Sequence, residues 1–224
     1  VIAETELAAI RAIKKIEVTY EEYEPLLTVE AALENTTNPL HQEYPDNILK
    51  STSWEIGSFD EAIKDRSLIK IEGTYETPIV KHCHIEPAIS FAYEEAGKIV
   101  VVSSTQIPHI IRRVCSQALG LPIGKIRIIK PYIGGGFGNR QDALTEPLNA
   151  YLTTRVGGRQ VKLEYTREET FAFTRVRHAM KFDIVSYVNK EGQFVARSIK
   201  AYSNQGGYAS HAHALVANAT NWFR

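Results

Sequence analysis

Residues 126–158, IRIIKPYIGGGFGNRQDALTEPLNAYLTTRVGG, place a strand pattern, a glycine-rich loop and a helix pattern in direct succession. The β-branched residues of 126–131 favour a strand, and 144–156 has the spacing of a helix that a glycine pair ends. Between them, the glycines of 134–138 allow backbone N–H groups to approach a ligand closely. This order predicts a binding loop between a strand and a helix.

The glycine loop matches neither of the common phosphate motifs. The dinucleotide fingerprint needs a small residue where Asn139 stands, and no Gly-Lys-Ser/Thr follows as the Walker pattern requires. A plain tight turn would not explain the large apolar side chain of Phe137, so we expect its ring to form the wall of a pocket. Two alternatives stay open. One is a nucleotide- or phosphate-binding module in which Gly134–Gly138 cradles a phosphate, helped by Asn139, Arg140 and Thr145. The other is a non-catalytic interaction domain.

Elsewhere in the chain, short helices and strands interleave without strict alternation, which predicts an α+β fold. We expect helices at 4–15, 29–34 and 108–119, and strands at 16–20, 69–75, 89–93, 99–104, 161–165, 181–188 and 194–201. Two pairs, Ser58 with Glu61 and Thr166 with Glu169, have the spacing of capping boxes.

Composition excludes several classes of protein. The 224 residues include 26 basic and 26 acidic side chains, so no overall field attracts nucleic acid or anionic lipid. Two cysteines, Cys83 and Cys115, cannot build a disulfide framework, a Cys-ligated zinc site or an iron–sulfur cluster. No apolar run approaches the ~20 residues that a bilayer requires. We therefore expect a packed, cytoplasmic protein with reduced thiols, no membrane span and no nucleic-acid partner.

A run of polar residues precedes the third predicted strand. His82, His84 and Glu86 alternate, so on a strand they would share one face, a spacing that could hold a metal ion. Pro87 ends this run, and three ligands from one strand rarely close a tetrahedral site, so we favour a hydrogen-bonded polar network near a cavity. Residues 103–106, between a strand and a helix, could contact a ligand or cap the helix.

Several motifs occur together in a recognisable order. They are His84-Ile85-Glu86-Pro87, Ser104-Thr105-Gln106, Leu119-Gly120-Leu121-Pro122, Lys125-Ile126-Arg127, Ile133 to Asn139, Arg177-His178, and Tyr202 to Tyr208. In this order and spacing, the sequence resembles the molybdenum-cofactor-binding subunit of the xanthine dehydrogenase and aldehyde oxidase family. The resemblance covers nearly the whole chain.

The resemblance implies a domain organisation. Residues 1–35 would be the C-terminal tail of an α/β hammerhead domain and residues 36–55 a linker. Residues 56–224 would be the N-terminal part of a molybdopterin-binding domain with a mixed sheet and packed helices, truncated at its end.

The resemblance also implies an activity and its partners. The activity is that of a hydroxylase that oxidises an N-heterocycle or an aldehyde with water-derived oxygen. This chain would hold the molybdenum–molybdopterin cofactor (Moco). An iron–sulfur subunit and an FAD subunit, or fused segments, would carry the electrons, because the two cysteines here cannot bind a cluster. The remainder of the molybdenum subunit and a small-molecule substrate complete the expected partners.

The family pattern further implies roles for individual residues. Gln106 would donate a hydrogen bond to an oxo ligand of molybdenum, with no direct protein ligand to the metal. The residues that would border the same ligand sphere are Gly135, Gly136, Phe137 and Gly138.

Two departures from the family pattern limit these implications. Gln141 stands where purine-oxidising members carry a Glu, so a weak substrate-pocket role is expected there and xanthine is not the expected substrate. By the family pattern, the Gly-Glu-Pro and Phe-Arg-Gly motifs would lie farther along than the given sequence reaches, and Phe223-Arg224 comes too early to supply the second. The active site is therefore expected to be incomplete, with no catalytic residue here, and the fragment alone is expected to be inactive.

Overall fold

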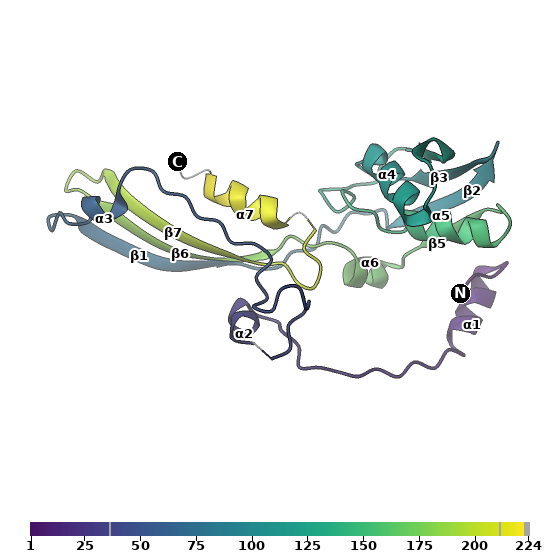
Figure 1. Ribbon diagram of the computed structural model, residues 1–224, viewed down its shortest axis with the longest axis horizontal. Helices are drawn as coiled ribbons and strands as arrows, with labels where there is room; N and C mark the ends of the chain where they lie inside the picture. The colour runs from purple at the N-terminus through teal and green to yellow at the C-terminus, as the bar shows by residue number, and fades with distance from the viewer. Residues whose placement is uncertain (36, 211, 222–224) are drawn as a thin grey trace. The chain divides into compact units, whose positions relative to one another are not determined.

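The computed structural model describes residues 1–35, 37–210 and 212–221. The chain divides into two compact units that alternate along the sequence (Figure 1). One unit contains Val1–Tyr23 and Lys81–Val176, and the other contains Glu24–Val80 and Arg177–Arg224. Each unit is built around its own sheet. None of the helices in the described part of the chain is long and apolar enough to cross a bilayer.

The first unit contains a four-stranded mixed sheet. Its order is β4 (Ile126–Ile129), β3 (Lys98–Ser103), β2 (Ile89–Glu95) and β5 (Val161–Glu164). Strand β3 pairs parallel with β4, while β2 pairs antiparallel with both β3 and β5. Helices α4 (Pro108–Leu119) and α5 (Glu146–Arg155) pack against this sheet (Figure 1). The buried core comprises Ala92, Ile99, Val101, Ile111, Cys115, Ile126 and Ala150.

Local chemistry explains where the helices of this unit begin and end. Helix α4 starts with Pro108 in its first turn and stops at Gly120, which adopts the left-handed conformation with φ +63°. Helix α6 (Arg167–Phe173) begins with the predicted capping box: the Glu169 N–H donates to Thr166 Oγ1 at 3.1 Å, and the Thr166 N–H donates to Glu169 Oε2 at 2.8 Å. The 3₁₀ turn η1 (Ile123–Lys125) leads into β4, and α1 (Glu6–Ile13) is the N-terminal helix.

The second unit contains a three-stranded antiparallel sheet of order β1-β6-β7. The strands are β1 (Ile69–Thr77), β6 (Ala179–Val188) and β7 (Phe194–Asn204). The helices are α2 (Val29–Glu34), α3 (Phe59–Ala62) and α7 (Ala212–Asn221). The predicted hairpin of β6 and β7 is confirmed, and mixed and antiparallel sheets with packed helices confirm the α+β class.

Three local predictions were wrong. Residues 16–20 form no strand, because they pair with no neighbouring strand and their apolar side chains are exposed. Ser58 makes no side-chain cap on α3; instead, the Phe59 N–H donates to Glu55 Oε1 at 3.0 Å. The predicted strand spacing of residues 82–86 is also absent, because this segment has no strand structure. The hammerhead assignment and the boundaries at residues 35 and 55 stay predictions.

Candidate functional site

Gln106 lies between β3 and α4; its side chain contacts the glycine loop and its backbone contacts Arg140, which follows the loop. Its N–H donates to Arg140 O at 3.0 Å, and its Oε1 accepts the N–H of Gly138 at 3.1 Å. A Cβ at Gly136 would lie 2.7 Å from Gln106 Oε1, so only glycine permits this approach. Because Oε1 is the acceptor here, the amide nitrogen Nε2 has two N–H donors, and no described residue accepts them.

The loop itself has unusual backbone geometry. Gly135 and Gly138 have φ of +104° and +93°, and Phe137, although not a glycine, has φ of +50°. The backbone N–H groups of Gly135, Gly136 and Phe137 donate to no described residue. The Phe137 ring is 74% exposed, so the pocket that we predicted around it is not enclosed by the described residues.

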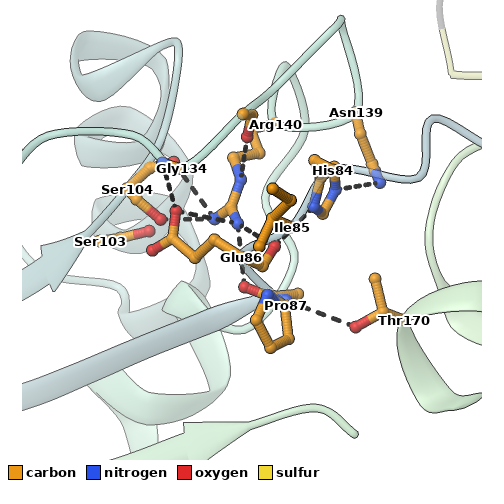
Figure 2. A network of polar contacts seen from close by, with 12 residues as sticks. His84, Ile85, Glu86, Pro87, Ser103, Ser104, Gly134, Asn139, Arg140 and Thr170 are labelled. Atoms are coloured by element: carbon orange, nitrogen blue, oxygen red, sulfur yellow. Dashed lines mark hydrogen bonds and ion pairs between the residues drawn. The ribbon is translucent and has the colours of Figure 1, made fainter. Parts of the chain in front are cut away.

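Arg140, directly after the loop, is 3% exposed and uses all of its guanidinium N–H groups within the chain (Figure 2). Its acceptors are Gly135 O at 3.0 Å from Nε, Ser104 O and Oγ at 3.3 and 2.5 Å from Nη1, and Glu86 O and Pro87 O at 2.8 and 2.9 Å from Nη2. Burial lowers the pKa of Arg140, while the carboxylates of Glu86 and Glu146 act in the opposite direction. Arg140 therefore has no free N–H group with which to bind a phosphate, the role that the sequence allowed for it.

The His84 side chain is part of the predicted polar network. Its Nδ1 lies 2.5 Å from Glu86 O and its Nε2 lies 2.9 Å from Asn139 Nδ2 (Figure 2). A carbonyl oxygen only accepts and an amide NH₂ only donates, so the neutral imidazole has its proton on Nδ1. Desolvation by burial lowers the pKa of His84 further than the Glu86 carbonyl raises it.

The metal interpretation of the His82, His84 and Glu86 spacing is wrong. Among the described residues, no group of three or more His, Cys, Asp or Glu side chains could hold a metal ion. The hydrogen-bonded network that we favoured is confirmed for His84 and Glu86, whereas His82 Nδ1 is buried with no hydrogen-bond partner among the described residues. The cavity beside the network, lined by His82, His84 and Asn139 among others, has a volume of about 10 Å³. That volume accommodates roughly one water molecule.

The remaining residues that the sequence singled out lie beside the glycine loop and Gln106. Gln141 is exposed, and its N–H donates to Gly138 O at 3.2 Å. Arg175 Nη1 also donates to Gly138 O, at 3.0 Å, and Arg175 forms an ion pair with Asp142 at 3.4 Å. Thr105 Oγ1 accepts the Ile107 N–H at 3.1 Å in a local turn, but no described side chain caps α4, so the capping alternative for residues 103–106 is not confirmed.

The sequence did not indicate that Glu86 and Arg140 form an ion pair beside the glycine loop. Glu86 Oε2 accepts the Gly134 N–H at 2.7 Å and lies 3.2 Å from Arg140 Nη2. The two side chains lie 54 positions apart in the sequence, so no local spacing brings them together. Only the presence of an Arg immediately after a glycine loop could have suggested such a contact.

The unpartnered donors describe what the site can bind. The Gln106 amide and three loop N–H groups are neutral donors, and they suit a ligand with several oxygen acceptors. Gly135 and Gly136 have no side chain, which lets His84 Cβ and the Gln106 amide lie directly against the loop backbone. The residues present therefore fit an oxygen-rich cofactor.

Residues 40–224 match the molybdopterin cofactor-binding domain family. A putative xanthine dehydrogenase molybdenum-binding subunit of Escherichia coli (strain K12) is 42% identical over 222 residues, which cover 99% of this chain and 29% of that protein. The nicotinate dehydrogenase large molybdopterin subunit of Eubacterium barkeri is 34% identical over 221 residues, which cover 98% of this chain and 51% of that subunit. The chain thus spans about a third to a half of these relatives.

Solved structures show the same fold. The aldehyde oxidoreductase from Desulfovibrio desulfuricans ATCC 27774 has a TM-score of 0.81 at 20% identity, covering 90% of this chain and 22% of that one. Quinoline 2-oxidoreductase from Pseudomonas putida 86 has a TM-score of 0.79 at 23% identity, covering 89% of this chain and 25% of that one. At these identities the likeness concerns the fold.

Proposed function

Because this chain belongs to the molybdopterin cofactor-binding domain family of the molybdenum hydroxylases, we propose that it holds the molybdenum–molybdopterin cofactor of an oxidoreductase through the Gln106 amide and the glycine loop. The observation that carries this proposal is the bond from the Gly138 N–H to Gln106 Oε1. That bond fixes the orientation of the amide and leaves its NH₂ group for a ligand.

Each residue of the loop has a distinct part in this proposal. Gln106 Nε2 and the N–H groups of Gly135, Gly136 and Phe137 donate hydrogen bonds to oxygen acceptors of the cofactor. Gly136 allows the Gln106 side chain to lie against the loop, and the exposed Phe137 ring borders the bound group. When bound, the cofactor supplies the oxidation of substrate with water-derived oxygen.

The substrate that we propose is an N-heterocycle or an aldehyde. Gln141 is exposed and neutral, so it offers no carboxylate at the position where purine-oxidising members carry one. A neutral amide lacks the negative charge with which a carboxylate would strengthen a hydrogen bond to a donor on a neutral purine edge. This difference supports a substrate other than xanthine.

We further propose that electrons leave through an iron–sulfur subunit and an FAD subunit. Of the two cysteines in this chain, Cys115 is fully buried in the core, so the chain offers no ligand set for a cluster. The general base would come from the remainder of the molybdenum subunit, and the fragment alone would be inactive. The same proposal includes a hammerhead tail over residues 1–35, a linker over residues 36–55, and a cytoplasmic location.

The phosphate-binding alternative has less support. A phosphate site at a glycine loop usually combines backbone N–H groups with a cationic side chain. Arg140 is the cationic side chain next to this loop, but its guanidinium already donates hydrogen bonds to five carbonyl and hydroxyl oxygens of the chain. The donors that stay available are uncharged, which suits oxygen acceptors of a metal–pterin group.

The test of this proposal compares holoenzyme preparations with Gln106→Ala and with the control Gln117→Ala, an exposed glutamine on α4. Loss of a hydrogen bond to a charged partner costs roughly 1.5–3 kcal/mol, about ten- to a hundredfold in affinity. We therefore expect the molybdenum content per subunit, measured by mass spectrometry, and the rate of substrate oxidation to fall in Gln106→Ala only. Full molybdenum loading and a normal rate in Gln106→Ala would contradict the proposal.

A nucleotide screen separates the phosphate alternative. A ligand at a hundred times its dissociation constant stabilises the folded chain by ~2.7 kcal/mol. We expect no nucleotide to raise the melting temperature of the protein. A nucleotide-dependent rise that Gly136→Ala abolishes would favour the alternative.

A further inference from the structure

Arg140 joins three segments that are distant in the sequence. Its guanidinium contacts Glu86 and Pro87 before β2, and Ser104 directly after β3 (Figure 2). It also donates to Gly135 O in the glycine loop. These contacts come from different nitrogens of one planar group and point in three directions. Arg140 therefore fixes the loop relative to two parts of the sheet.

The same residue also holds Gln106 through its backbone. The Arg140 carbonyl accepts the Gln106 N–H at 3.0 Å, and the Thr105 hydroxyl donates to the same oxygen at 3.4 Å. The side chain of Gln106 is bonded to Gly138, two residues before Arg140. The backbone N–H and the side-chain oxygen of Gln106 are thus both hydrogen-bonded to the segment from Gly138 to Arg140.

These contacts form a closed ring. The guanidinium of Arg140 donates to Ser104, two residues before Gln106, while the Arg140 carbonyl accepts from Gln106 itself. A shift of the glycine loop relative to Gln106 would have to break bonds on both sides of Arg140. The position of the Gln106 amide therefore depends on the position of the Arg140 side chain.

A lysine could not replace this arrangement. Lysine has three donors on a single nitrogen, whereas the acceptors around Arg140 are reached from Nε, Nη1 and Nη2 separately. The ion pair with Glu86, at 3.2 Å, involves only Nη2. Conserving the charge would keep that attraction and lose the bonds to Gly135 and Ser104.

We propose that Arg140 is a positioning residue, which sets the Gln106 amide and the glycine loop in the arrangement that the cofactor requires. Arg140 acts through Gln106 and the loop and does not itself contact the cofactor. This inference rests on the proposed function, because the amide has a role only if a cofactor binds beside it.

The experiment uses the holoenzyme with Arg140→Lys, with Gln106→Ala, and with Arg112→Lys as the matched control. Arg112 also donates to two backbone carbonyls, Ile123 O at 3.1 Å and Ile126 O at 2.9 Å, but lies on α4 outside the ring. The readouts are hydrogen exchange in peptides covering 103–107 and 134–141, and the resonance Raman bands of the molybdenum centre.

For Arg140→Lys we expect amide exchange in both peptides to accelerate roughly ten- to a hundredfold, as the loss of hydrogen bonds to a charged donor implies. We also expect its Raman bands to shift in the same direction as those of Gln106→Ala. Arg112→Lys should leave both unchanged. Exchange at the wild-type rate, or faster exchange with wild-type bands, would overturn the inference.

Two further comparisons keep the result interpretable. If Arg140→Lys does not fold, Ser104→Ala removes one acceptor of Nη1 and should give smaller changes of the same sign; unchanged exchange and bands in Ser104→Ala would also overturn the inference. If wild-type protein contains no molybdenum, or if Gln106→Ala leaves the bands unchanged, the proposed function fails. Faster exchange in Arg140→Lys would then show only that Arg140 stabilises the loop, and its role toward the cofactor would fall with the proposed function.

Discussion

Glu86 and Gly134 are hydrogen-bonded to each other twice. The Gly134 N–H donates to Glu86 Oε2 at 2.7 Å, and the Glu86 N–H donates to Gly134 O at 3.2 Å. A Cβ built on Gly134 would lie 2.5 Å from Glu86 Cβ, an atom next to the backbone that cannot move away alone. The start of the glycine loop is therefore held against the segment before β2 by contacts that tolerate no side chain.

We predict that Gly134→Ala destabilises the protein by overpacking. Forcing a methyl group against Glu86 Cβ should lower the free energy of unfolding by roughly 1–3 kcal/mol. The matched control is Gly124→Ala, where a Cβ meets nothing within 4 Å, and its effect should stay within about 0.5 kcal/mol. Urea titrations of both variants measure this difference. Equal stability of the two variants would show that the loop can shift away from Glu86 at little cost.

Sequence patterns were sufficient where the structure depends on local chemistry. Helix α4 has its proline start and glycine end, and α6 has its capping box, because these interactions involve residues within one or two turns. Ser58 failed as a cap because Glu55 supplies the acceptor for the Phe59 N–H instead. Residues 16–20 alternate as a strand would, but alternation provides no partner strand with which to pair.

The sequence indicated the glycine loop of the candidate site, but it did not indicate the long-range contacts that hold this loop in place. The family resemblance pointed to Gln106 and the glycines, and the structure places the Gln106 amide against Gly136 and Gly138. The bonds from Arg140 to Glu86 and Ser104 cross 54 and 36 positions of sequence. Such contacts depend on how β2, β3 and the loop meet in space, and one sequence does not specify that.

We predict that the two thiols differ strongly in reactivity. Cys83 is exposed, while Cys115 is fully buried, and burial together with the nearby Glu146 carboxylate raises the pKa of Cys115 to about 12. At pH 8 only roughly one Cys115 in ten thousand would be a thiolate, which is the reactive form. Timed labelling with an alkylating reagent, followed by peptide mass analysis, should find Cys83 modified and Cys115 modified only after unfolding. In Cys83→Ser, rapid labelling should be absent; a fast-reacting Cys115 would contradict the packing of the core.

The histidines before β2 predict a pH dependence of stability. Burial lowers the pKa of both His82 and His84, so the folded state binds a proton less readily than the unfolded chain. For His84, the guanidinium groups of Arg140 and Arg167 lower the pKa further, while Glu86 raises it. The stability that the neutral imidazoles provide is complete above about pH 6.5, the unfolded value, and is lost as the pH falls through the lowered pKa.

Melting temperatures measured between pH 8 and pH 5 check this prediction. The wild-type melting temperature should fall below about pH 6.5, and His84→Asn should show a smaller fall, because one of the two histidines no longer titrates. The exposed His109 makes a control, and His109→Asn should retain the wild-type pH dependence. A steeper fall in His84→Asn would mean that His84 is charged in the folded protein, against the contacts of its two nitrogens.

Phe137 should separate stability from function. Its ring is 74% exposed, so removing it costs little packing, and its φ of +50° is a backbone conformation that a side chain does not favour. We predict that Phe137→Ala changes the free energy of unfolding by less than about 0.5 kcal/mol, while the holoenzyme loses turnover because the ring no longer borders the cofactor.

Phe173→Ala is the matched control, since that ring is 72% exposed and lies outside the loop. Phe137→Gly should be at least as stable as Phe137→Ala, because glycine adopts positive φ freely. If Phe137→Ala instead unfolded easily and retained its turnover when folded, the ring would be structural, and the wall of the site would have to come from another residue.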